Sequence, residues 1–206
     1  MSTTSPSQAP ITDFHNVLTL SSRKYWDTTV HDAEGRPLYW IEEPGSRTLQ
    51  FSHDPIHIYR RSTPGSLSSE DDDAMLIHRE EVATINFCRF RDSKVVYHGK
   101  ELLLNELMRK KQYFGSAHIS STPIGDVEWS LKLYSPELHG ISGTKLLTSA
   151  NVALVSTGTP QIEVSNLIDI FNPEVMDLLV VGWVTMMHQA EKKRRRIIST
   201  GAIAGS

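Results

Sequence analysis

Short apolar runs separated by turn-forming residues recur along most of the chain. They have strand length and are rich in Val, Ile, Thr, Tyr, Phe and Trp, as in PLYWI at 37–41. In VEWSLKL at 127–133, apolar and polar residues alternate, which predicts a strand with one buried face and one face in water. Many such strands at close spacing predict one mostly β domain, built as a sandwich or a barrel.

Near residue 173 the pattern changes from alternation to a continuous apolar run. Asn172 is placed to cap a helix, and Pro173 suits its first position. A helix over about 173–194 is therefore predicted, ending in a basic run that suits the negative end of its dipole. Apolar residues cover every side of this helix, which is typical of a helix in a protein core. The residues expected in the core are Leu178, Leu179, Val181, Gly182, Trp183 and Met186.

The same run is too short to cross a bilayer as a simple span. Only ten uncharged residues, Leu178 to Met187, precede His188, whereas a spanning helix needs about 20 apolar residues. A helix that lies on a membrane should be polar on one side, and this one is apolar on every side. The economical prediction is a helix threaded through a closed β-barrel, with strands around it.

Polar segments mark both ends of the chain and one internal loop. Residues 1–13 are rich in Ser, Thr and Pro and are expected to be disordered, and residues 197–206 are expected to form a flexible tail. One domain is thus expected over 14–196. In the polar loop at 62–74, the four consecutive acids at 70–73 indicate a cation site, phosphorylation of the preceding serines, or simply a solvated loop.

A second interruption, KELLLNELMRKK at 100–111, carries an apolar stripe at helical spacing. It predicts a short amphipathic helix that packs on its own domain or binds a partner.

The net charge and the cysteine content indicate which kinds of partner and which cellular compartment to expect. The net charge is −3 over 206 residues, and the basic residues are not interleaved with aromatics, so nucleic acid is not an expected partner. The single cysteine, the polar N-terminus and the lack of an Asn-x-Ser/Thr acceptor favour an intracellular protein. We expect it in the cytoplasm, with a nuclear or peripheral membrane pool as alternatives.

Catalytic motifs are absent from the sequence, so neither enzymatic activity nor a cofactor is expected. His53 and His57 would have metal-binding spacing on a helix, but Pro55 between them favours a turn and a strand, and no metal site is predicted. His188 is interpreted as a partner of the helix dipole and Cys88 as a small core residue.

Five segments carry a family resemblance: TTVHDAEGRPLYWIEE at 28–43, GDVEWSLKLY at 125–134, FNPEV at 171–175, DLLVVGWVTMM at 177–187 and the closing KKRRR at 192–196. In pattern and order the chain resembles the tubby C-terminal-like superfamily over about residues 14–196. Its branches include tubby proteins, LURP-one-related proteins and phospholipid scramblases, and the chain is most similar to small fungal single-domain members of unknown function.

The resemblance implies a closed antiparallel barrel of about twelve short strands around one buried hydrophobic C-terminal helix. Tubby domains bind phosphoinositide head groups through cationic surface residues. The chain lacks the cysteine cluster and the long proline-rich N-terminal region of scramblases, so lipid scrambling is not expected.

Three cationic clusters are the candidate head-group ligands: Lys192, Lys193, Arg194, Arg195 and Arg196; Arg109, Lys110 and Lys111; and Arg60 and Arg61. The resulting hypothesis is a non-enzymatic peripheral module that binds acidic phospholipids such as phosphoinositides. A soluble adaptor that binds another protein through its loops stays open as the alternative. For the last cluster in the chain, a nuclear import signal or a solubilising helix end also stays open.

Overall fold

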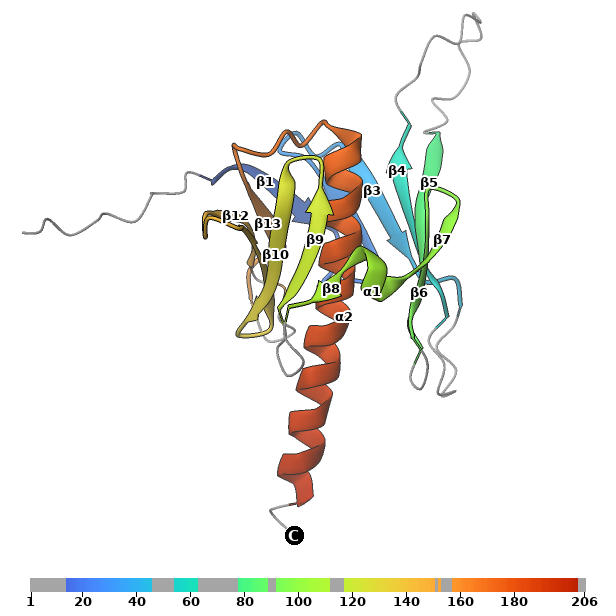
Figure 1. Cartoon of the computed structure of the whole chain (residues 1–206), viewed down its shortest axis with the longest axis vertical. Coiled ribbons are helices and arrows are strands. Elements are labelled where there is room, and N and C mark those ends of the chain that lie inside the picture. The colour runs from blue at the N-terminus through green and yellow to red at the C-terminus, as the bar shows by residue number, and fades with distance from the viewer. Residues whose placement is uncertain are drawn as a thin grey trace, which may run out of the picture.

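The computed structural model describes residues 14–45, 54–62, 78–88, 92–111, 117–150, 152 and 157–203. The described chain is mostly β, as predicted, with 13 strands in one antiparallel sheet, one short helix and one long C-terminal helix (Figure 1). The expected disorder at 1–13, the acids at 70–73 and His53 fall outside the described residues.

The strands are β1 (Phe14–Leu20), β2 (Asp27–His31), β3 (Pro37–Glu42), β4 (Ile56–Arg61), β5 (Arg79–Asn86), β6 (Lys94–Tyr97), β7 (Lys100–Leu103), β8 (Arg109–Lys110), β9 (His118–Thr122), β10 (Gly125–Lys132), β11 (Ser135–Gly140), β12 (Lys145–Ala150) and β13 (Gln161–Ser165). The helices are α1 (Leu104–Leu107) and α2 (Pro173–Ile203).

Neighbouring strands in the sheet are also neighbours in the chain, except for the central pair β1 and β13. The order is β7-β6-β5-β4-β3-β2-β1-β13-β12-β11-β10-β9-β8, so β1 and β13 join the early and late parts of the chain. Hydrogen bonding between the described strands stops at β7 and β8. The predicted closed barrel of about twelve strands is therefore not confirmed, because the ladder of 13 strands is open between these two edges.

Helix α1 lies at the opening between β7 and β8. Its single turn is stabilised by the Glu106 carboxylate, which accepts a hydrogen bond from the Leu103 N–H at 2.9 Å. The longer amphipathic helix expected over 100–111 is thus wrong in extent, because Lys100–Leu103 pairs with β6 as a strand and only four residues are helical. A helical turn at this place leaves the edge strands β7 and β8 without a common ladder.

The alternation in β10 behaves as predicted at its centre and fails at its end. Val127 and Trp129 are buried beside α2, and Trp129 is 1% exposed. Leu133, expected on the same face, lies beyond the strand in the β10–β11 turn at a φ of 48° and is 85% exposed. The turn reverses the chain before Leu133 can face the core.

Helix α2 begins where the sequence predicts. The Asn172 side-chain oxygen accepts hydrogen bonds from the backbone N–H of Glu174 at 3.0 Å and of Val175 at 3.4 Å, which satisfies two amides of the first turn. The helix then runs between the two halves of the curved sheet (Figure 1).

The buried part of α2 extends from Val175 to Ala190. Of the expected core residues, Leu179, Val181, Gly182, Trp183 and Met186 are buried, and only Leu178 is half-buried. The Trp183 indole N–H donates to Ser149 Oγ at 2.9 Å, so its polar atom is satisfied inside the core. In the described part of the chain, no helix is long and apolar enough to cross a membrane.

Beyond Ala190 the helix leaves the sheet. It continues to Ile203 instead of ending near residue 194, so the segment expected to be a flexible tail from 197 is helical as far as Ile203. At a rise of about 1.5 Å per residue, the last 13 residues extend roughly 20 Å past the core. The last turn has no basic residue, so the basic run Lys192–Arg196 does not sit at the negative end of the helix dipole as predicted.

The β2–β3 turn provides a first testable prediction through Asp32. Its carboxylate is buried and accepts hydrogen bonds from the Arg36 N–H and Nε at 2.8 and 2.7 Å and from the Glu34 N–H at 3.1 Å. Burial alone would raise the pKa of Asp32, but these hydrogen bonds and the Arg36 charge outweigh it and hold the pKa below its ordinary value. The stability that this carboxylate contributes is then present above about pH 4 and lost as the pH falls through the lowered pKa.

Asp32→Asn should therefore cost about 1 kcal/mol at pH 7 and progressively less at pH 4 and pH 3. Urea unfolding at the three pH values measures the difference from the wild type. A penalty that stays constant with pH would contradict the assignment.

Candidate functional site

The first of the three predicted cationic clusters is Lys192–Arg196 on α2, and most of its residues are exposed. Lys192, Lys193, Arg195 and Arg196 are exposed and Arg194 is half-buried. Arg195 is partly neutralised, because its Nε and Nη2 lie 3.0 and 2.8 Å from Glu191 Oε1 on the preceding turn. The cluster sits on rigid helix that has already left the sheet.

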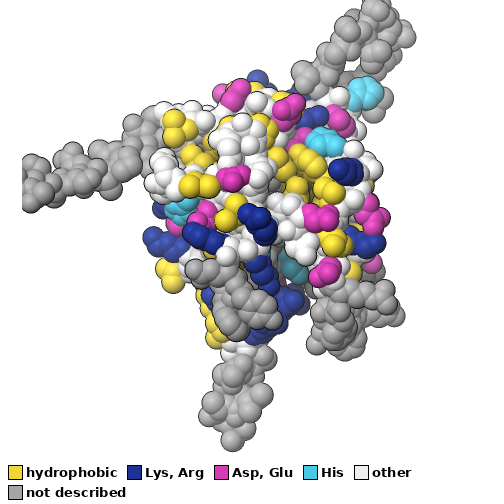
Figure 2. All heavy atoms as spheres, viewed as in Figure 1, with side chains coloured by type: hydrophobic (Ala, Val, Ile, Leu, Met, Phe, Trp, Pro, Cys, Tyr) yellow, Lys and Arg dark blue, Asp and Glu magenta, His cyan; other side chains and the backbone are white. Residues whose placement is uncertain are grey.

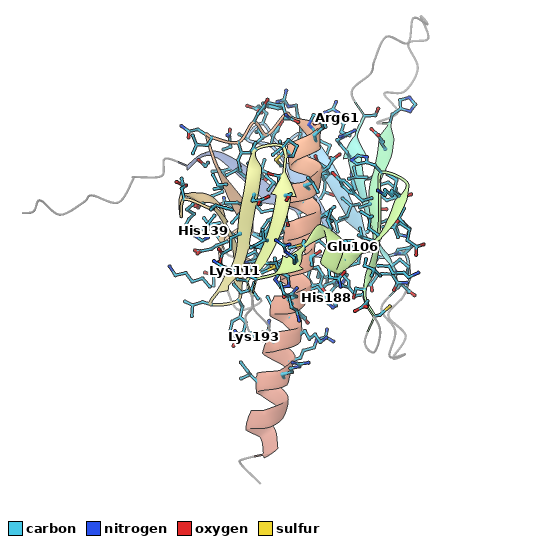
Figure 3. All side chains as sticks on the ribbon, viewed as in Figure 1. Arg61, Glu106, Lys111, His139, His188 and Lys193 are labelled. Carbon is cyan, nitrogen blue, oxygen red and sulfur yellow. The ribbon has the colours of Figure 1, made fainter. Side chains whose placement is uncertain are left out.

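The second cluster, Arg109–Lys111, lies close to the first. Strand β8 pairs with β9 so that Lys110 opposes His118, and His118 Nε2 lies 3.2 Å from Gln189 Nε2 on α2. Gln189 is one turn before Lys192, so the two clusters share one end of the molecule. Figure 3 shows Lys111 and Lys193 toward this end, and in Figure 2 Lys and Arg side chains gather where α2 leaves the sheet. Lys111 is paired with Glu128 at 2.6 Å.

The third cluster, Arg60 and Arg61, lies at the opposite end of the molecule, and Arg60 is paired with carboxylates of the same chain. Arg61 is labelled at the top of Figure 3, far from Lys193. Arg60 holds two carboxylates, with Nη1 at 2.7 Å from Asp177 and Nη2 at 2.6 Å from Glu80. Because Asp177 precedes Lys192 by 15 helical residues, roughly 22 Å separates the two ends. Arg60 therefore anchors α2, and the three clusters do not form one surface.

Asp177 is a buried carboxylate at the start of α2, and it is fully shielded from solvent. Its Oδ1 accepts a hydrogen bond from the Tyr39 hydroxyl at 2.8 Å, and its Oδ2 lies 2.7 Å from Arg60 and 3.1 Å from His98 Nε2. Burial raises the pKa of Asp177, while the Tyr39 hydrogen bond and the Arg60 charge oppose the rise. Burial and the Asp177 charge also raise the pKa of Tyr39.

This network was not predicted from the sequence. The available signal was an acid inside the otherwise apolar stretch 175–187. Both carboxylate oxygens are occupied by donors from β3, β4 and the β6–β7 turn, so the network links the helix start to three parts of the sheet. Its chemistry is that of a structural anchor.

A groove of about 900 Å³ lies at the opening of the sheet. It is lined by α1, β8 and β9, and α2 contributes Thr185 and Gln189. These two polar residues are four apart and therefore lie on the same side of the helix. Arg109 and Lys110 also line it, so the groove adjoins the cationic end. Its volume is within the range of small-molecule sites, about 300–1,000 Å³.

The remaining sequence candidates have ordinary structural roles. His57 Nδ1 lies 2.8 Å from Glu81 on the neighbouring strand. Cys88, expected in the core, is instead a half-buried free thiol just after β5. His188 is not near the end of α2, so it is not the predicted dipole partner. Its Nδ1 lies 2.8 Å from the Tyr25 hydroxyl, and its ring stacks on Phe87 with centroids 3.7 Å apart. Within the described ranges, no group of three or more His, Cys, Asp or Glu side chains could hold a metal ion.

Fold and site together define a class: an antiparallel β-sheet protein curved around one C-terminal helix whose cationic end leaves the sheet. No protein-family model matches the chain, and no curated protein matches it. A crystal structure of an Arabidopsis thaliana protein is similar at 11% identity and a TM-score of 0.42, covering 85% of this chain and 91% of that one. A similarity this weak supports no functional argument.

Proposed function

We propose that the chain is a non-enzymatic peripheral module that binds acidic phospholipid head groups, phosphoinositides among them, at its cationic end. The observation that carries the proposal is the joint position of Lys192–Arg196 and Arg109–Lys110 at the place where α2 leaves the sheet. Cations on a projecting rigid helix can approach an anionic surface without unfolding any of the core. Each such charge contributes on the order of 1 kcal/mol near an acidic leaflet.

The tubby-like assignment belongs to the same proposal. It rests on the order of the sequence segments and on a mostly β domain that ends in one core helix. Under this proposal the barrel of the superfamily is completed at one side by α1 rather than by strand pairing. The groove beside Arg109 and Lys110 is the place where a single head group would enter most deeply.

The test is vesicle co-sedimentation with a pair of charge-matched variants. Lys192→Gln/Lys193→Gln removes two charges from the cationic end, and Arg61→Gln/Lys100→Gln removes two from the opposite half. At low salt we expect the first variant to lose about 2 kcal/mol of binding to vesicles containing phosphatidylinositol 4,5-bisphosphate, roughly 30-fold in affinity. The second should bind as the wild type does.

Binding should also weaken between low and physiological salt, because the charges are exposed and screened. Equal losses of vesicle affinity in both variants would mean that the whole protein surface attracts the vesicle and that no specific binding site exists. No binding by the wild type at low salt would refute the lipid proposal and favour the adaptor alternative, in which partner capture survives neutralisation of Lys192–Arg196.

A further inference from the structure

The end of the molecule opposite the cationic helix exposes large apolar side chains. Ile124, Ile141, Leu167 and Phe171 are between 43% and 71% exposed. They lie in three connections, β9–β10, β11–β12 and β13–α2. We call these four residues and the connections that carry them the loop end. Exposed apolar clusters rimmed by polar residues mark interaction surfaces in soluble proteins.

Strand register brings these residues together. Gly125 of β10 pairs with Thr122 of β9, so Ile124 lies at the start of β10. Val127 of β10 pairs with Gly140 of β11, so Ile141 lies beside the same end of β10. Leu147 of β12 pairs with Val164 of β13, so Leu167, three residues after Val164, lies beside the β11–β12 turn. Three strand spacings of about 4.8 Å keep the set within roughly 15 Å along the sheet. In Figure 2 hydrophobic side chains appear at the upper left, on the side where Figure 1 labels β12 and β13.

The charges within these three connections are all negative, whereas Arg61 on β4 lies at the same end of the molecule. The connections, residues 122–126, 140–144 and 165–174, contain Asp126, Asp169 and Glu174 and no Lys or Arg. All three carboxylates are exposed. Asp126 and Asp169 each accept one local hydrogen bond, from Ser121 Oγ and from the Phe171 N–H, and keep their charge toward solvent.

The segment Lys192–Ile197 of α2, which we call the helix tail, is positively charged and carries an exposed apolar residue, so it complements the loop end. It presents five consecutive cations followed by Ile197, which is 54% exposed. Within one molecule the tail cannot reach the loop end, because α2 starts at the loop end and the tail follows about 20 residues later, roughly 30 Å along a rigid helix. The matching surfaces are therefore available only between two copies.

We propose that the chain associates head to tail, with the helix tail Lys192–Ile197 of one copy docking on the loop end of the next. Ile197 contacts the apolar side chains around Leu167 and Phe171, and the cations face Asp126, Asp169 and Glu174. The two surfaces differ, so the contact is heterologous and continues as a ring or a filament. The inference does not depend on lipid binding, although an acidic membrane competes for the same tail.

Analytical ultracentrifugation at low salt tests the proposal with the full chain. Wild type is expected to form oligomers in a concentration-dependent way, and salt at 0.5 M should weaken them. Asp126→Lys/Glu174→Lys and Lys192→Glu/Lys193→Glu should each weaken association at least about tenfold. The combined four-site variant, with both charges exchanged, should associate again. Asp27→Lys/Glu101→Lys, with the same charge change outside the loop end, is the matched control.

The loop-end variant separates this inference from the lipid proposal, because it should lose self-association and keep vesicle binding. Leu167→Ser/Phe171→Ser provides a second probe without a charge change and should also weaken association. A wild type that remains monomeric at low salt and high concentration would overturn the proposal. Unchanged association in both loop-end variants, or failure of the four-site variant to recover it, would overturn it as well.

Discussion

Gly182→Arg is expected to abolish folding. A Cβ atom at Gly182 would lie 2.6 Å from Cζ2 and 2.8 Å from Nε1 of Trp129, which is itself fully buried. The longer side chain would then place an unpaired charge between α2 and β10. Such a charge costs several kcal/mol, a large part of the total stability of about 5–15 kcal/mol for a domain.

Graded substitutions separate the steric effect from the electrostatic one. Gly182→Ala should cost about 1–3 kcal/mol through overpacking, offset by up to about 1 kcal/mol of helix propensity. Ile197→Arg, at an exposed position of the same helix, should change stability by less than about 0.5 kcal/mol. Circular dichroism during thermal unfolding measures all three. A cooperative transition of Gly182→Arg near the wild-type temperature would show that α2 is not held against Trp129.

Asp177→Ala should destabilise the fold by about 3–5 kcal/mol, the usual cost of removing one partner from a buried ion pair. Without the carboxylate, the largely buried Arg60 loses its inner partner and the Tyr39 hydroxyl is left unpaired inside the core. The loss is larger than that of a surface pair because the freed groups cannot regain full hydration.

Two neighbouring substitutions serve as controls for Asp177. Glu174→Ala removes an exposed acid from the same helix turn and should cost less than about 1 kcal/mol. Tyr39→Phe removes one hydrogen bond of the network and should cost about 1 kcal/mol. Chemical denaturation at pH 7 gives the free energies of unfolding. If Asp177→Ala were no more destabilising than Glu174→Ala, the network would have no anchoring role.

Features governed by local physics were predictable from the sequence. The alternation at 127–131 gives a strand with Val127 and Trp129 buried, because side chains of a strand point to opposite faces in turn. Asn172 caps α2 as expected, since the oxygen that accepts the free amides lies within three residues of them. The uniformly apolar run of α2 is buried on every side, because only a surrounding core can cover such a helix.

The predictions that were wrong concern contacts between segments that are far apart in the chain. The opening between β7 and β8 depends on whether two edge strands pair, and in the structure they do not, with the helical turn Leu104–Leu107 between them in the chain. Arg60 was grouped with the surface cations because its neighbour Arg61 is also basic. In the structure it is paired with Glu80 and with the buried Asp177, which is 117 residues away in the chain.

The sequence by itself determined the mostly β class, the start and burial of α2 and the basic run that follows its buried part, because periodicity, capping and composition act over a few residues. Tertiary structure alone decided which charges face water and which are paired inside. It placed Lys192–Arg196 beside Arg109–Lys110, removed Arg60 from that surface and placed four exposed apolar residues in loops at the other end. These outcomes follow from strand order and register, which are set by the packing of the whole sheet around one helix.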